Sequence, residues 1–213
     1  CQYAAAVCAC MPALQGPAAA SQLAKAARQL VVAFCSLAGD IFPKPAVTSA
    51  AAAAGSAANA AYAAPVTVTH VAQMLRLVLP WCMPAEQVLE QALAGDEGQL
   101  VDACRALAAL CTGHKVGVLE AASAAVAGQQ QGSIFTALES LTCSLLAAGG
   151  VSAASSAEAW LPDCTEMLLE CWSGLLAPQC GYAMTAVPPP AQAVECATRT
   201  AAAVVEAALK DAA

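Results

Sequence analysis

The chain has 213 residues, of which 60% are hydrophobic but only 4% are aromatic. Much of the apolar count is alanine, the strongest helix former, and β-branched residues are sparse, so the composition predicts an all-α fold and argues against a sheet. Eight Lys and Arg against fifteen Asp and Glu give a net charge of −7 with no basic run, which excludes a nucleic-acid-binding surface and suits basic protein partners or simple solubility.

The first segment, residues 1–45, predicts two helices. One apolar face consists of Tyr3, Val7, Cys10 and Leu14 and ends at Gly16-Pro17. The next consists of Leu23, Ala27, Leu30, Phe34 and Leu37 and ends at Gly39. The chain begins with neither a Met nor a basic stretch, so we expect no signal peptide and interpret this end as the start of a fragment.

An Ala-rich loop or insertion is expected at residues 46–65. The run from Pro45 to Thr69 carries no charge and is long enough to suggest a membrane span. Its Ala, Ser, Thr, Gly and Asn residues, however, supply little transfer free energy. We therefore predict a soluble loop and no membrane contact.

Helical periodicity returns after this loop and continues to the end of the chain. The successive apolar stripes are Val68–Val71–Leu75–Leu79, Val88–Leu89–Leu93, Leu100–Cys104–Leu107–Cys111, Val116–Leu119–Val126, Ile134–Leu138–Leu141–Leu145, Leu168–Cys171–Trp172–Leu175 and Val194–Thr198–Ala201–Val205–Leu209. Glycines or prolines separate them, at Gly95, Gly113, Gly128, Gly149 and Pro178. For the helix that contains Leu168, two starts remain open: a capping box at Ser155 and Glu158, or Pro162 itself.

These stripes predict about nine helices in antiparallel pairs that recur about every 30 to 46 residues, the range of HEAT and armadillo units. The expected fold is a right-handed α-helical solenoid, one segment of about four helix pairs over residues 1–213. A compact helical bundle is the structural alternative. The solenoid is favoured because no stripe has the width of a helix that is buried on all sides.

The twelve cysteines do not have the spacing of a disulfide framework. Cys104 and Cys111 are seven residues apart, as are Cys164 and Cys171, so the two thiols of each pair share a helical face but lie about 10 Å apart along the axis. That separation is too large for a bridge within one helix. We expect the cysteines to act as small hydrophobic residues in a reducing compartment.

No residue is predicted to have a catalytic, cofactor-binding or metal-ligating role, and the protein is not expected to be an enzyme. His70 and His114 fall in different elements, and Cys8-x-Cys10 has no second pair of ligands. The spacing of His and Cys residues therefore does not predict a zinc site. Cys111 and His114 in CTGH could form a thiolate–imidazolium pair, but a buried structural Cys beside a loop His is the preferred interpretation.

Two glutamates and two tryptophans that could belong to a functional site are also interpreted as structural residues. Glu166 and Glu170 are one helical turn apart and are expected on a solvated helix edge. Trp172 is expected in the core, against the helix centred on Leu141. Trp81, beside two prolines, is either a corner residue or a surface anchor.

One part of the sequence resembles a known family. Residues Ser133 to Leu176, SIFTALESLTCSLLAAGG…AWLPDCTEMLLECWSGLL, are similar to the central repeats of exportins in the importin-β (karyopherin-β) HEAT-repeat superfamily, the exportin-4 type above all. Weaker similarity covers LQGP, Leu14 to Pro17, and LVDACRALAALC, Leu100 to Cys111. The Ala-rich stretch from Thr48 to Ala64 has no counterpart in that family.

The resemblance implies an internal fragment of a nuclear transport receptor. Such a receptor binds protein cargo in a Ran-GTP-dependent manner, contacts nucleoporins weakly, uses no cofactor, and moves between cytoplasm and nucleus. The alternative function is a general helical-repeat scaffold for protein complexes without GTPase coupling. An enzyme that uses Cys111 and His114 is the third hypothesis.

Overall fold

The computed structural model describes residues 22–41, 68–127, 134–149, 159–176 and 190–211. Within these ranges the chain is all-α, with no strand. The eight α-helices are α2 (Gln22–Ile41), α3 (Val68–Val78), α4 (Ala85–Leu93), α5 (Gly98–Gly113), α6 (Lys115–Ala127), α7 (Ile134–Ala147), α8 (Trp160–Leu176) and α9 (Ala191–Asp211), and the short 3-10 helix η3 (Leu79–Trp81) follows α3. The predicted helix at Tyr3–Leu14, the loop at 46–65 and the capping box at Ser155 lie outside the described residues.

Glycines end two of the helices as the sequence indicates. Gly95 follows α4 with a φ of 102°, and its N–H donates to the carbonyl of Ala92 while the N–H of Asp96 donates to the carbonyl of Gln91. These two bonds form a Schellman motif, which needs a left-handed residue that glycine adopts without strain. Gly149 has a φ of 94° after α7 and donates to Leu146 in the same way.

Within the described residues α8 begins two positions before Pro162, the later of the two predicted starts. The helix begins at Trp160, so Pro162 lies in its first turn. The first four N–H groups of a helix have no partner within it, so a proline there removes no hydrogen bond.

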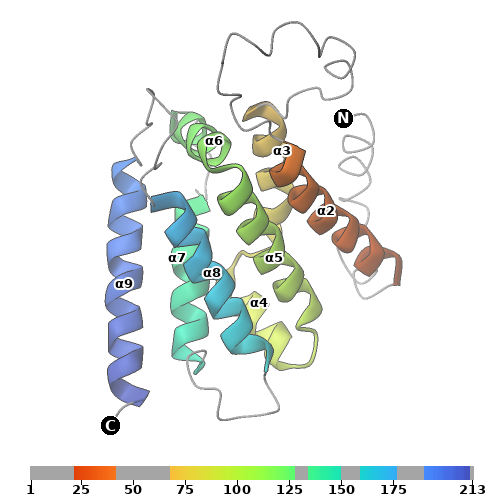
Figure 1. Cartoon of the computed structure of the whole chain (residues 1–213). Helices are drawn as coiled ribbons and strands as arrows, with labels where there is room; N and C mark the ends of the chain where they lie inside the picture. Colours follow the sequence, from red (N-terminus) through yellow and green to blue (C-terminus); the bar gives the residue numbers. More distant parts are fainter. Residues whose placement is uncertain (1–21, 42–67, 128–133, 150–158, 177–189, 212–213) are drawn as a thin grey trace, which may run out of the picture.

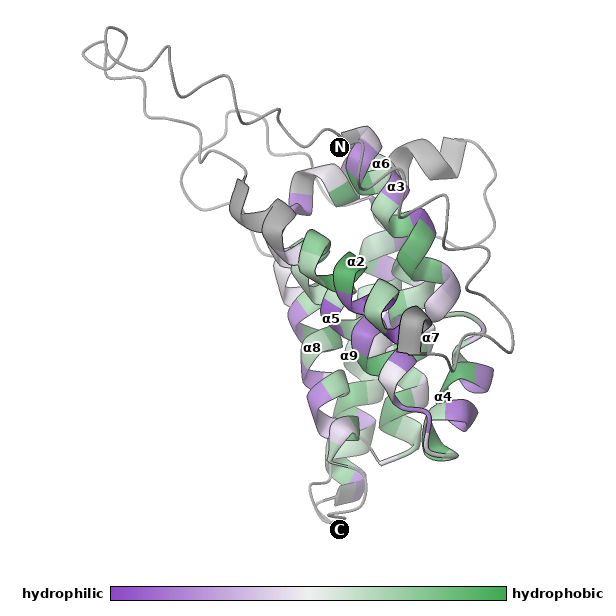
Figure 2. Ribbon diagram, turned by 90° about the vertical axis from the view of Figure 1, so that its right-hand side faces the viewer, coloured by the Kyte–Doolittle hydropathy of each residue, from purple (hydrophilic) through white to green (hydrophobic). Residues whose placement is uncertain are grey.

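Helices α2, α5 and α8 lie side by side, because α5 packs against both of the others. Figure 1 shows that the chain runs in the same direction along all three, and in the opposite direction along α7 and α9. Behind them, α7 packs against α4 on one side and α9 on the other, while α3 and α6 pack on each other. Figure 2 shows α5 and α8 on one side of the molecule and α4 and α7 on the other.

The predicted inward faces of α5, α7 and α8 are confirmed. Leu100, Cys104, Leu107 and Cys111 on α5 are completely buried, and so are Leu138 and Leu141 on α7 and Leu168 on α8. The buried side chains form one continuous cluster from Val31 on α2 to Cys196 on α9.

The expectation of narrow stripes is wrong for α5. Its buried residues also include Asp102, Ala103, Ala106 and Leu110, so the buried face covers about 200° of the helix at 100° per residue. Helix α5 is covered this widely because α2, α8, α3, α4 and α6 all contact it. The width of the buried face of α5 therefore does not favour a solenoid over a compact bundle.

The predicted face of α9 is wrong, and that of α2 is correct only in part, because Ala27 and Phe34 pack partly buried against the core. On α2 the buried residues are Arg28, Val31 and Cys35, whereas Leu30 is 51% exposed. On α9 the buried residues are Ala193, Cys196 and Thr200, whereas Val205 and Leu209 are 59% and 68% exposed. The inward face of α2 includes the charged Arg28, which pairs with Asp102 of α5, and the inward face of α9 consists of small residues.

In the described part of the chain, no helix combines the length and the apolarity that crossing a bilayer requires.

Candidate functional site

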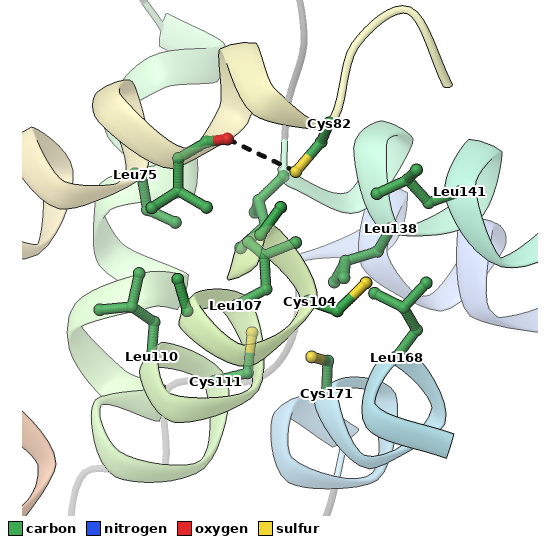
Figure 3. Packing of buried hydrophobic residues seen from close by; sticks show 14 of the residues in the cluster. Leu75, Cys82, Cys104, Leu107, Leu110, Cys111, Leu138, Leu141, Leu168 and Cys171 are labelled. Atoms are coloured by element: carbon green, nitrogen blue, oxygen red, sulfur yellow. Dashed lines mark hydrogen bonds between the residues drawn. The ribbon is translucent and has the colours of Figure 1, made fainter. Parts of the chain in front are cut away.

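The predicted pairing of Cys111 with His114 involves two buried residues at the end of α5. Cys111 lies on the last turn of the helix, and His114 is its C-cap, with a backbone N–H that donates to the carbonyl of Leu110 at 2.8 Å. His114 lies between α5 and α6 in neither helix, as the sequence predicts, and it is only 3% exposed. Cys111 is buried in the core between Leu107 and Leu110 (Figure 3).

The thiol of Cys111 faces another thiol. The neighbouring Cys111 thiol, together with burial, raises the pKa of Cys171 well above its usual value. A cysteine that keeps its proton and is closed off from solvent is a poor nucleophile. The surroundings of Cys111 are therefore those of a structural residue.

The carboxylates of Glu166 and Glu170 are both exposed on α8. Hydrophilic positions follow this outer edge of α8 in Figure 2. The pair lies on a solvated edge, as the sequence predicts. Among the residues that the structure describes, no group of three or more His, Cys, Asp or Glu side chains could hold a metal ion.

Trp172 and Trp81 are both buried where helices pack together. Trp172 is 5% exposed, and its ring stacks on Phe135 of α7 with ring centroids 6.5 Å apart. This confirms its predicted position against the helix that contains Leu141. Trp81 is also buried, in η3, which favours the corner residue over the surface anchor.

The interface between α5 and α8 brings together four cysteines that the sequence presents as two separate pairs. The Cys164 thiol raises the pKa of Cys104, the Cys104 thiol lowers the pKa of Cys164, and the Cys111 thiol raises the pKa of Cys171. Because the earlier cysteine of α5 meets the earlier cysteine of α8, the two helices run parallel. Figure 3 shows the sulfur atoms of Cys104, Cys111 and Cys171 between the two helices.

A glycine lets the two helices approach closely at one end of this interface. A Cβ atom added to Gly174 would lie 3.1 Å from the carbonyl oxygen of Cys111. This neighbour is backbone and cannot move without shifting α5. Gly174 therefore permits the contact that aligns Cys171 with Cys111.

Replacing Gly174 by alanine should lower the free energy of unfolding by up to about 2 kcal/mol, since overpacking costs about 1–3 kcal/mol and alanine regains only about 1 kcal/mol in helix propensity. Gly98 of α5 is the matched control, because a Cβ there meets nothing within 4 Å. Gly98→Ala should leave stability unchanged or raise it by up to about 1 kcal/mol. Urea denaturation followed by circular dichroism measures both, and equal effects would contradict the close approach at Gly174.

A polar network joins α7 to α9. Arg199 of α9 donates from Nη2 to Oε2 of Glu139 at 2.8 Å and from Nε to the other carboxylate oxygen, and its Nη1 donates to Glu195 at 2.7 Å. The hydrogen bonds from Arg199 lower the pKa of Glu139. The Cys196 thiol also bonds to Glu139, and burial followed by this bond raises the pKa of Cys196 to about 11. The network fixes α9 on α7 and keeps Cys196 protonated.

An ion pair that the sequence does not reveal joins α2 to α5. Nε of Arg28 lies 3.5 Å from Oδ2 of Asp102, and each side chain is 9% exposed. Asp102 lies within the Leu- and Ala-rich stretch of α5. A carboxylate among these apolar residues is the signal in the sequence that could have indicated a buried ion pair. The two residues are 74 positions apart, so only the packing of the helices brings them together.

Comparisons with protein families, with curated proteins and with solved structures find no significant match to this chain.

Proposed function

We propose that this chain is a segment of an α-helical repeat protein that binds other proteins. The supporting observation is the arrangement of α2, α5 and α8. Each is the third helix after the one before it along the chain, neighbouring members pack side by side, and the chain runs in the same direction along all three. Helices α4 and α7, also three apart, pack on each other in the layer behind, as do α3 and α6. Stacking of equivalent helices is what a solenoid of HEAT or armadillo type requires, with units of three helices instead of the two expected from the sequence.

The chemistry of the surface agrees with a binding role. The described residues contain no cluster that could hold a metal, and Cys111 and His114 are both buried in the helix packing. Helix α8 carries Asp163, Glu166 and Glu170 on its exposed side and no Lys or Arg at all. With a net charge of −7, such an edge attracts proteins with basic surfaces and raises their association rate.

The more specific function is a segment of an exportin-like nuclear transport receptor that binds protein cargo in a Ran-GTP-dependent manner. Its support is the resemblance of Ser133 to Leu176, which spans α7 and α8. Helix stacks of this kind contact mainly their neighbours, so they change curvature at modest cost and can close on large partners. The protein would then work in both cytoplasm and nucleus and would also meet nucleoporins.

The transport function predicts a nucleotide-dependent interaction. The intact protein that carries this chain, used as bait, should retain Ran loaded with GTP at least tenfold better than Ran loaded with GDP, because transport receptors distinguish the two states. Equal retention would rule out the transport function and leave the general scaffold.

A charge-reversal pair tests the acidic edge in the same pull-down. Glu166→Lys with Glu170→Lys should weaken capture of basic protein partners. Glu86→Lys with Glu90→Lys on α4 is the matched control, since it reverses two exposed carboxylates four residues apart in the other layer. If both double variants behave alike, the interaction depends on net charge and not on the α8 edge.

A further inference from the structure

The apolar stripe that the sequence predicts to face inward on α9 lies on the outer surface of that helix. Helix α9 packs on α7 through its opposite side and stands at the edge of the molecule in Figure 1. The exposed residues that form this outer stripe are Val194, Thr198, Ala201, Ala202, Val205, Ala208 and Leu209. At 100° per residue they cover about 120° of the helix along nearly its whole length. A continuous apolar face of this width on an exposed helix indicates a contact surface.

A charged edge runs along one side of the outer stripe. It consists of Glu195, Arg199, Glu206 and Lys210, which form two ion pairs within α9 and keep 51% to 73% of each side chain exposed. None of these four residues lies within the stripe. A partner that covers the stripe would therefore leave the charges at the rim of the contact, still accessible to water.

We propose that the outer stripe of α9 binds the same stripe of a second copy of this chain, with the two helices antiparallel. A two-fold axis between Ala201 and Ala202 makes the stripe complementary to itself. The facing pairs are then Val194 with Leu209, Thr198 with Val205, and Ala201 with Ala202. The larger side chains meet towards both ends of the contact, and the alanines at its centre let the two backbones approach closely.

The charged edge determines the partner and its direction. In the antiparallel pair Glu195 of one copy lies beside Lys210 of the other, and Glu206 lies beside Arg199, each pair offset by about 3 Å along the helix axes. In a parallel pair each residue would lie beside itself, so carboxylates would face carboxylates. Opposite charges beside a helix contact stabilise it and like charges oppose it.

The same edge does not favour a strongly charged partner, because its two carboxylates and two basic groups balance each other. A second copy of α9 supplies the matching alternation of charge. The observations therefore favour self-association over capture of a basic or an acidic protein by this surface.

The first experiment measures the mass of the full chain in solution by light scattering over a wide range of concentration, with dithiothreitol present to prevent disulfide-linked dimers. One helix from each copy makes an interface below about 1,200 Å², a size typical of weak association. The mass should therefore rise with concentration from that of one chain to that of two. A chain that stays monomeric at the highest concentration would overturn the proposal. Growth beyond two chains would also overturn it, because a two-fold contact is closed.

A substitution in the outer stripe tests whether this surface makes the contact. Val205→Lys should weaken self-association by roughly tenfold or more, because the contact would bury an ammonium group without a partner. Leu93→Lys on α4 is the matched control, since Leu93 is a large aliphatic residue that is 46% exposed, and it should leave self-association unchanged. Circular dichroism checks that both variants are folded. Equal effects of the two substitutions would contradict a contact through α9.

A charge exchange tests the antiparallel direction. Glu195→Lys and Lys210→Glu should each weaken self-association, because each places like charges side by side between the two copies. The double variant should recover it, since the opposite charges face each other again. Within one α9 the double variant keeps both new like-charge neighbours, so the recovery can come only from the contact between copies. Single variants without effect, or a double variant without recovery, would overturn the antiparallel arrangement. None of these positions lies on α8, so the result is independent of the proposed capture of basic partners.

Discussion

Replacing Trp172 by alanine is expected to lower the free energy of unfolding by about 3–5 kcal/mol. The side chain is buried between α7 and α8 and stacks on Phe135 at an interplanar angle of 26°. Truncation removes a large apolar surface and leaves a cavity between two helices that other contacts hold in place. Urea denaturation followed by circular dichroism gives the difference between the variant and the wild type.

Trp172→Phe is the matched control for this prediction. It keeps an aromatic ring against Phe135 but removes the indole N–H, whose nitrogen is buried without a hydrogen-bond partner. An unsatisfied buried donor costs about 1–3 kcal/mol, so its removal offsets part of the lost volume. We expect the Phe variant to lose clearly less than the Ala variant, and a loss below about 1 kcal/mol for Trp172→Ala would place the side chain outside the core.

Replacing Asp102 by alanine is expected to cost about 3 kcal/mol of stability. The change removes the carboxylate that faces the buried guanidinium of Arg28 across the interface of α2 and α5. Breaking one side of a buried ion pair costs about 3–5 kcal/mol, and the long distance of 3.5 Å places this pair at the lower end. Equilibrium denaturation at neutral pH measures the loss.

Two further variants identify the cause of that loss. Asp163→Ala removes an exposed carboxylate and should change stability by no more than about 0.5 kcal/mol. Combining Arg28→Met with Asp102→Leu replaces both charges with apolar groups and should recover most of the stability, since burying an ion pair gains little over apolar packing. If Asp102→Ala and Asp163→Ala have the same effect, the ion pair does not hold α2 on α5.

The face that each helix turns inward could be predicted only where large apolar residues decide it. On α5, α7 and α8 the Leu residues leave one possible inward face, and that face is buried. On α2 and α9 some large apolar residues, Leu30 and Leu209 among them, are exposed. There Arg28 and Arg199 form ion pairs with Asp102 and Glu139 on other helices. Helical periodicity carries no information about a partner 60 or more residues away.

For the cysteines, too, the sequence predicts part of the arrangement and only the packing of the helices shows the rest. Their spacing of seven residues predicts that Cys104 and Cys111 share one face of a helix, and that Cys164 and Cys171 do so on another. It also correctly predicts that the two members of each pair are not bonded to each other. That the two faces meet in register could not be read from spacing, because register depends on the relative position of two helices.

The sequence by itself determined the all-α fold, the positions of most helix ends and the inward faces of the Leu-rich helices. These properties depend on residues within a few turns of each other: alanine favours the helix, glycine accepts the left-handed conformation that ends it, and leucine is driven out of water. Only the tertiary structure decided that α5 lies between α2 and α8, and which charged residues are buried. Those contacts join residues far apart in the chain, and their free energies depend on the distances and burial that packing creates.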